Sequence, residues 1–312
     1  MASRRPMKVG FFVPAQQGGM ADGALRWADV RAMARRAEEI GFDSFWLPDH
    51  LITRHPGQPT SGPWECWSLL CALAASTSRI ELGTGVICTG FRNPALLAKM
   101  ADTLDEISGG RLILGLGAGW HEPEYTAFGY PFDHRVGRFE EALQIITNLL
   151  RTGQVDFTGE YYTARECELR PRGPRAQGPP IMIGALGSGK RMMRLTAEYA
   201  DLWNGWFRAT RSYPDTVPPL RAAVDAACAD AGRDPGTLIR TVGIEIDQRP
   251  AAERPIFPVN GAHPLTGTPE AIAETLRGFA REGITHIQIV TALNGLEAVE
   301  ALAPVLAELD EG

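Results

Sequence analysis

A charged pair follows directly after a short apolar run near the N-terminus. Residues 44–48 have the composition of a buried strand, and Asp49 and His50 come next in the chain. Histidine is the side chain best suited to exchange protons near neutral pH, and an adjacent carboxylate can orient a ring or a cofactor. The pair therefore indicates proton transfer at a strand end. The residue types also leave open that Asp49 only caps the loop and that His50 lies on the surface.

A glycine-rich segment precedes a helical pattern in the second half of the chain. Residues 184–190 match the start of a nucleotide-binding loop, but Arg191 stands where a Ser or Thr should hold Mg²⁺, which argues against nucleotide hydrolysis. A turn made of Gly187, Ser188 and Gly189 still offers free backbone N–H groups and the positive end of a helix dipole to a phosphate. We favour phosphate binding over an ordinary capped helix.

Two further strand-like runs end in glycines. Glycines inside the run 80–86 are typical of a bulge, a close ligand or a tight barrel corner. The run 112–117 leads into a second glycine-rich stretch that resembles a dinucleotide fingerprint. A long loop separates that stretch from the next helical pattern, whereas Rossmann glycines open a helix directly. We therefore exclude a Rossmann site.

Aromatic residues gather near the expected strand ends. Most of them are expected to pack in the core, and a subset can line an apolar pocket against a tricyclic ring. The candidates for this substrate pocket are Trp46, Trp120, Trp206 and Phe207.

Composition argues against several other classes. The net charge is −6 and no basic stripe is interleaved with aromatic residues, so we expect no nucleic-acid partner. The five cysteines form no CxxC pair, which argues against a disulfide framework and a zinc site. Residues 121–124 (HEPE) lack the second histidine of a zincin, and Pro123 disfavours a helix there, so we expect no metal. Without a membrane span or a signal peptide, we expect a soluble, cytoplasmic protein.

The elements that must position these residues alternate regularly along the chain. Eight apolar runs are each followed by a segment with helical spacing, which indicates a parallel sheet covered by helices. Eight such units in 312 residues predict an α/β fold with a single (β/α)₈ TIM barrel over residues 1–312, and its active site at the C-terminal strand ends. Residues 155–178 and 247–268 break the rhythm and are predicted insertions. The expected strands are 8–14, 44–48, 80–86, 112–117, 181–184, 202–205, 239–246 and 284–290, and the expected helices are 28–40, 67–75, 94–107, 138–150, 190–199, 218–231, 269–282 and 296–309.

Three segments together resemble the luciferase-like monooxygenase superfamily, and within it most the F420-dependent oxidoreductases. They are LGTGVICTGFRNPALLAKMADTLDEISGGRLILGLGAGW, EYTAFGYPFDHRVGRFEEALQII and PPIMIGALGSGKRMMRLTAEYADLWN. The resemblance implies a barrel with the phosphate of a cofactor at the glycine-rich turn of the fifth strand and its ring at the barrel mouth. It also implies a bulge after the third strand that supports the ring, with a cis peptide bond between Gly85 and Val86 and with Cys88 nearby.

The resemblance also carries individual residues over to this chain. In the sugar-phosphate dehydrogenases of the family, an Asp-His pair after the second strand binds cofactor and handles a proton, and this pair matches Asp49 and His50. Those enzymes carry a Glu where this chain has Trp120, so the resemblance disfavours sugar-phosphate oxidation and favours a small, apolar substrate. Backbone contacts with the cofactor map onto Ala118 and Gly119, and onto Ser188, Gly189, Arg191 and Met192.

Three functions remain open. The main hypothesis is hydride transfer between F420 and a small organic substrate, with His50 as proton donor or acceptor. The alternative is an FMN-dependent monooxygenase, which requires the same phosphate turn, O₂ and a partner reductase. The third is a non-catalytic flavin-binding relative, against which the intact Asp49–His50 pair argues. The resemblance further implies a homodimer, for which we expect the early helices to form the interface.

Overall fold

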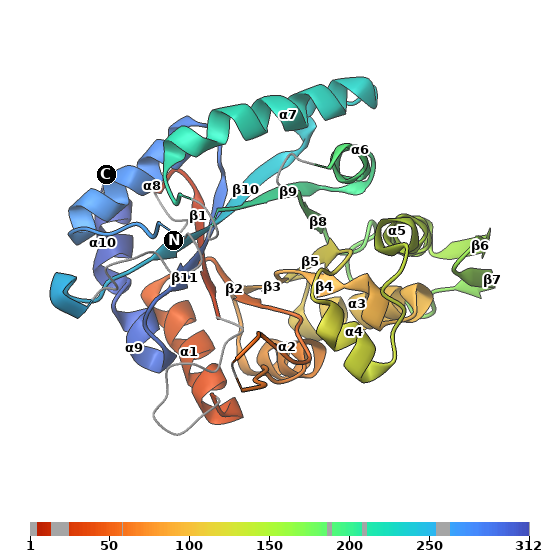
Figure 1. Cartoon of the computed structure of the whole chain (residues 1–312), viewed down its shortest axis with the longest axis horizontal. Helices are drawn as coiled ribbons and strands as arrows, with labels where there is room; N and C mark the ends of the chain where they lie inside the picture. The colour runs from red at the N-terminus through yellow and green to blue at the C-terminus, as the bar shows by residue number, and fades with distance from the viewer. Residues whose placement is uncertain are drawn as a thin grey trace.

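Parallel strands that alternate with helices close into a ring (Figure 1). The computed structural model describes residues 5–13, 25–57, 59–185, 189–207, 211–253 and 263–311. Within these ranges the ring consists of β1 (Lys8–Phe12), β2 (Ser44–Leu47), β3 (Glu81–Thr84), β5 (Leu112–Gly117), β8 (Ile181–Gly184), β9 (Leu202–Trp206), β10 (Ile239–Ile246) and β11 (His286–Thr291).

The pairing of the strands closes the barrel. The order along the sheet is β3-β2-β1-β11-β10-β9-β8-β5, and an additional pairing of β3 with β5 joins its two ends. All of these pairings are parallel. A short strand, β4 (Ile87–Cys88), adds a parallel pairing to β5 beyond the end of β3. The predicted (β/α)₈ barrel is therefore confirmed.

Helices cover the outside of the barrel (Figure 1). The helix that follows β4 shows how local sequence sets their ends: Pro94 is its first residue, and the Asn93 side chain accepts the N–H groups of Ala95 and Leu96. None of the helices in the described ranges is long and apolar enough to cross a membrane. The helices are α1 (Trp27–Ile40), α2 (Cys66–Ser76), α3 (Pro94–Ser108), α4 (Glu122–Phe128), α5 (Arg135–Thr152), α6 (Lys190–Tyr199), α7 (Val217–Asp230), α8 (Pro269–Arg281), α9 (Gly295–Glu300) and α10 (Ala303–Glu311).

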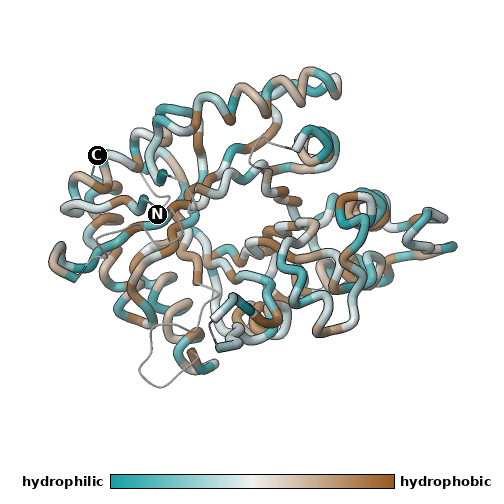
Figure 2. Tube along the Cα trace, in the orientation of Figure 1, coloured by the Kyte–Doolittle hydropathy of each residue, from teal (hydrophilic) through white to brown (hydrophobic). Residues whose placement is uncertain are grey.

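Three segments differ from the sequence-based expectation. Pro123 does not prevent a helix, because it lies in the first turn of α4, where a missing N–H costs no intrahelical bond. The expected helix 296–309 is divided into α9 and α10. The expected insertion 155–178 contains most of an antiparallel hairpin, β6 (Gln154–Thr158) and β7 (Thr163–Glu168), which projects from the barrel (Figure 1). In Figure 2 this hairpin is mostly hydrophilic, whereas hydrophobic segments gather around the barrel strands.

Tryptophan side chains fill the barrel interior opposite strand glycines. Trp46 has no exposed surface, and a Cβ added at Gly83 would lie 2.2 Å from its ring. The Trp206 ring packs against Gly243 of β10 in the same way, since a Cβ added at Gly243 would lie 2.1 Å from this ring. These glycines are therefore explained by close packing. The apolar cluster inside the barrel comprises Phe12, Trp46, Ile113, Met182, Leu202 and Val290, with Val86 and Trp206 half-buried against it.

Replacing the glycine beneath Trp46 should destabilise the barrel. Gly83→Ala places a methyl group against a ring that is buried on all sides, so the ring or the backbone must shift. We expect a loss of about 1–3 kcal/mol of folding free energy, an overpacking cost. Scanning calorimetry should show a melting temperature lower by about 2–4 °C for each kcal/mol lost.

Gly184→Ala is the matched control, because this glycine also lies on a barrel strand. The nearest atom to its added Cβ is 3.9 Å away, an ordinary contact distance. Its melting temperature should equal that of the unaltered protein. Equal melting temperatures for the two alanine variants would contradict the packing argument.

Candidate active site

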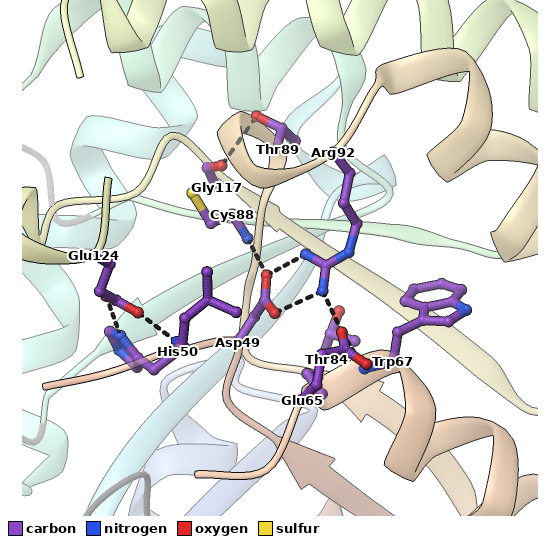
Figure 3. Close-up of polar contacts among 12 residues, drawn as sticks. Asp49, His50, Glu65, Trp67, Thr84, Cys88, Thr89, Arg92, Gly117 and Glu124 are labelled. Atoms are coloured by element: carbon purple, nitrogen blue, oxygen red, sulfur yellow. Dashed lines mark hydrogen bonds and ion pairs between the residues drawn. The ribbon is translucent and has the colours of Figure 1, made fainter. Parts of the chain in front are cut away.

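His50 lies just beyond the end of β2, and Glu124 of α4 holds its ring (Figure 3). Nδ1 of His50 is 2.7 Å from Oε1 of Glu124, whose Oε2 accepts the backbone N–H groups of Leu51 and Ile52. The Glu124 side chain is 2% exposed, so these donors replace the water that a carboxylate would otherwise bind. A carboxylate opposite Nδ1 places the proton of a neutral ring on Nδ1, which leaves Nε2 as the atom that can gain or lose a proton.

Aromatic rings surround the exposed side of His50. Trp120, which is 63% exposed, meets the His50 ring edge-on, with ring centroids 5.7 Å apart. The His121 ring lies 5.0 Å from Trp120 and 5.7 Å from His55. Trp120 therefore offers an exposed aromatic surface beside the His50 ring.

Asp49 is buried in a network of protein donors (Figure 3). Arg92 donates to both of its carboxylate oxygens, at 2.6 and 2.9 Å, and the Cys88 N–H donates to one of them at 2.9 Å. Arg92 also donates to Glu65, which caps the N-terminus of α2. Burial alone would lower the pKa of Arg92, but its bonds to Asp49 and Glu65 raise that pKa overall. Asp49 therefore joins the end of β2 to the segment after β3. Its two carboxylate oxygens, which were expected to face a cofactor, are both bonded to Arg92.

The bulge after the third strand has the backbone that the family resemblance implies. The Gly85–Val86 peptide bond is cis, and Val86 is half-buried above the apolar cluster inside the barrel. Cys88 follows in β4 with its Sγ 2.9 Å from the Tyr125 hydroxyl, and burial raises the pKa of this thiol to about 12. Burial thus favours the neutral thiol at Cys88, a predicted cofactor contact.

Tyr125 also covers the loop that follows β5. Its hydroxyl donates to the Ala118 carbonyl at 2.8 Å. Gly119 has a φ of +74°, and a Cβ added there would lie 2.1 Å from the same hydroxyl. Both residues were predicted to contact the cofactor through their backbone, and the structure shows that packing against Tyr125 already requires a glycine at position 119.

The predicted phosphate turn is described only in part. Gly187 and Ser188 lie outside the described residues, and Gly189 is the N-cap of α6, where no side chain caps the helix. Arg191 is ion-paired with Glu140, 2.8 Å from its Nε, and Met192 packs against the core. Arg191 also lines a pocket of about 580 Å³ that it shares with the first turn of α5.

The four candidate pocket aromatics divide into two groups. Trp120 and Trp206 are accessible, and Trp206 packs against Phe12 with ring centroids 5.0 Å apart. Trp46 is enclosed in the barrel, and Phe207 faces Phe279 in the main core at 2% exposure. We therefore keep Trp120 and Trp206 as candidate pocket residues and place Trp46 and Phe207 in the core.

The residues present fit a flavin-type cofactor. Val86 and Trp206 are half-buried apolar side chains that pack against the cluster inside the barrel, and a Cβ added at Gly184 would lie 3.9 Å from its nearest neighbour among the described residues. The uncapped first turn of α6 offers N–H groups to a phosphate. Among the described residues, no group of three or more His, Cys, Asp or Glu side chains is arranged to hold a metal ion.

Sequence analysis missed two residues of this site. Glu124 was overlooked because Pro123 was interpreted as a helix breaker, although its spacing of three from His121 places both on one side of a helical turn. Arg92 carries no local signal, since its partner Asp49 lies 43 positions earlier.

Comparison with known proteins points to one family. A profile described as luciferase-like monooxygenase matches residues 7–247. The pyrimidine monooxygenase RutA of Stutzerimonas stutzeri is 34% identical over 242 residues, which cover 73% of this chain and 65% of that protein. RutA of Enterobacter cloacae is 32% identical over 264 residues, covering 79% and 70%. The chain thus spans less than two thirds of the length of the S. stutzeri protein.

Two solved structures share the fold at low sequence identity. An F420-dependent secondary alcohol dehydrogenase in complex with an F420–acetone adduct superposes with a TM-score of 0.78 at 19% identity, covering 97% of this chain and 99% of that one. The oxygenating constituent of 3,6-diketocamphane monooxygenase from Pseudomonas putida, in complex with FMN, superposes with a TM-score of 0.72 at 18% identity, covering 97% and 96%.

Removing Arg92 should destabilise the protein by isolating a buried charge. Arg92→Met leaves the Asp49 carboxylate, 5% exposed, with the Cys88 N–H as its remaining donor among the described residues. We expect a loss of about 3–5 kcal/mol, because breaking one side of a buried ion pair leaves the other charge uncompensated. Urea unfolding followed by circular dichroism measures the loss.

Two comparison variants test the cause. The double variant Asp49→Asn/Arg92→Met should recover part of the stability, since it also removes the buried charge. Arg170→Met removes an exposed pairing with Glu168 and should leave the unfolding midpoint unchanged. If the double variant is no more stable than Arg92→Met, the isolated charge is not the cause.

Proposed function

This chain belongs to the luciferase-like monooxygenase family, and we propose that it is an FMN-dependent monooxygenase that receives reduced flavin from a separate reductase. The observation that carries the proposal is the 31–34% identity to pyrimidine monooxygenases over about three quarters of the chain. The F420-dependent structures share 18–19% identity and support the fold alone. We therefore rank the monooxygenase above F420-dependent hydride transfer, the main sequence-based hypothesis. Both readings make the protein an oxidoreductase.

Four parts of the chain would hold the flavin. Val86 and Trp206 provide the apolar surface beneath the ring, Gly184 leaves room beside it, and the first turn of α6 after Gly189 binds the phosphate. Reduced flavin supplies the two electrons that let one atom of O₂ enter the substrate while the other leaves as water. The aromatic and aliphatic side chains of this surface exclude bulk water from the ring.

His50 moves a proton beside the ring. Its Nε2 gains or loses the proton, and Glu124 keeps the other ring nitrogen protonated through the 2.7 Å bond to Nδ1. Because Glu124 also accepts two backbone N–H groups, it fixes the orientation of the His50 ring relative to the mouth. Asp49 acts indirectly: it holds the segment after β3 in place through its bonds to Arg92 and Cys88.

The substrate we propose is a small planar ring. Trp120 offers an exposed aromatic face next to His50, and such a face favours stacking of a flat molecule. The relatives are named pyrimidine monooxygenases, which places nitrogen heterocycles first among the candidates. This choice replaces the apolar substrate expected from the family resemblance with a flat but polar one.

A homodimer through the early helices also remains a proposal. Large apolar side chains are exposed on or beside α1, α2 and α3, and exposed apolar patches mark association surfaces. These side chains are Trp27, Trp64, Leu96 and Ile107, which are 36%, 55%, 56% and 46% exposed.

Cofactor preference is tested by binding FMN and F420 to the purified protein side by side. A bound flavin should quench tryptophan fluorescence, because Trp206 lies in the proposed ring surface. We expect FMN to do so at a lower concentration than F420. Riboflavin, which lacks the phosphate, should bind more weakly than FMN if the turn before α6 binds a phosphate. A clear preference for F420 would contradict the proposal and restore hydride transfer as the leading hypothesis.

His50 and Glu124 are tested by turnover with a flavin reductase and a pyrimidine substrate. His50→Gln should lower kcat by about 10²–10⁴-fold, the usual contribution of a general acid or base, with little change in FMN affinity. In Glu124→Gln, the amide oxygen is needed by the N–H groups of Leu51 and Ile52, so the NH₂ group faces Nδ1 and favours the opposite ring tautomer; kcat should fall and its pH profile should change. Glu274→Gln is the control, since Glu274 is exposed on α8 and pairs with Arg281 on the same helix. Unchanged kcat in both site variants would contradict the assigned roles.

A further inference from the structure

The first turn of α4 holds the loop that follows β2 by two side chains. Glu124 accepts the N–H groups of Leu51 and Ile52, at 2.5 and 3.3 Å. His121 accepts the N–H of Arg54 through its Nε2, at 3.0 Å. Three positions of the loop, 51, 52 and 54, are therefore attached to one helical turn.

The attached segment is a small hairpin. Thr53 and Ser61 exchange two backbone hydrogen bonds, at 2.6 and 3.1 Å, and their hydroxyls lie 2.7 Å apart. Arg54 adds a bond from its Nε to the Thr60 hydroxyl at 3.2 Å. Because Thr53 and Ser61 connect the two sides of the hairpin, releasing Arg54 from α4 loosens both sides, while Glu124 still holds Leu51 and Ile52.

The bond from Arg54 to His121 exists only while the imidazole is neutral. A protonated imidazole carries N–H groups on both ring nitrogens and cannot accept a hydrogen bond from a backbone N–H. His121 is 6% exposed, and burial lowers the pKa of its ring below the ordinary value of 6.5. The nearby charges act in both directions, since Glu124 raises this pKa while His50 and His55 lower it. Arg54 faces His121 with its backbone, and its guanidinium bonds to Thr60.

We propose that His121 is a positioning residue that latches the hairpin containing Arg54 onto α4 while its ring is neutral and releases this attachment when its ring is protonated, whereas Glu124 keeps its bonds to Leu51 and Ile52. The loop begins next to His50, and His121 also contacts Trp120, so the latch sets the shape of one wall of the mouth. The latch consists of His121 and its neighbours in the protein, so it does not depend on whether the barrel binds FMN or F420.

The direction of the pH dependence follows from linkage. The released ring has the ordinary pKa near 6.5 and the latched ring a lower one, so the released state binds protons more readily. The latch is therefore at full strength above about pH 6.5 and weakens as the pH falls below that value.

Hydrogen–deuterium exchange of the full chain, without added cofactor or substrate, tests the latch directly. Exchange of peptides covering 50–62 is compared at pH 5.5 and 7.5 after correction for intrinsic rates. In the unaltered protein we expect protection at pH 5.5 to be lower by on the order of fivefold, the loss of about one net hydrogen bond. His121→Gln keeps an acceptor that does not titrate, so the loop should stay protected at both pH values. His121→Leu removes the acceptor and should lower protection at both.

Two controls separate the latch from general effects. His55→Gln removes a neighbouring histidine and should retain the pH dependence, and peptides from α3 should exchange equally in all variants. If His121→Leu fails to fold, the comparison of His121→Gln with the unaltered protein still decides the question. A pH-dependent loss of protection that persists in His121→Gln, or equal protection of the unaltered protein at both pH values, overturns the proposal. Since no cofactor or turnover enters the measurement, its failure would leave the proposed function untouched.

Discussion

The buried contact between Arg92 and Asp49 is the constraint on which the geometry of the mouth depends. One guanidinium joins the end of β2, the cap of α2 and, through Asp49, the segment after β3. A buried carboxylate requires such compensation, because an unpaired charge in this environment is strongly unfavourable. The segments that carry His50 and Val86 are thus fixed relative to each other before any ligand binds, which is the preorganisation that a catalytic site requires.

A second carboxylate, Glu124, organises the other side of the mouth. It receives the His50 ring and two backbone N–H groups, while His121, one turn earlier, receives a third backbone N–H. One short helix therefore sets the tautomer of His50 and the position of the loop beside it. This coupling explains how a change at His121 can alter the mouth without any contact to the reacting atoms.

The barrel itself does not determine which cofactor chemistry takes place. Structures with F420 and with FMN superpose on this chain at nearly the same quality, with TM-scores of 0.78 and 0.72. The same fold binds F420 in one of these proteins and FMN in the other, so fold similarity carries little information about the reaction. We rank monooxygenase activity first because the sequence similarity to pyrimidine monooxygenases goes beyond the shared architecture. The side chains at the mouth must account for that activity.

Local sequence determined the strands, most of the helices and the position of the Asp49–His50 pair, because hydrophobic periodicity and caps such as Asn93–Pro94 act within a few residues. Only the tertiary structure decided what these residues do. Asp49 binds Arg92 and Cys88 of the protein, Trp46 and Phe207 belong to the core, and Glu124 supplies a carboxylate from 74 positions away. No local pattern encodes such pairs, since they form when the barrel closes and brings the loops of different strands to one end.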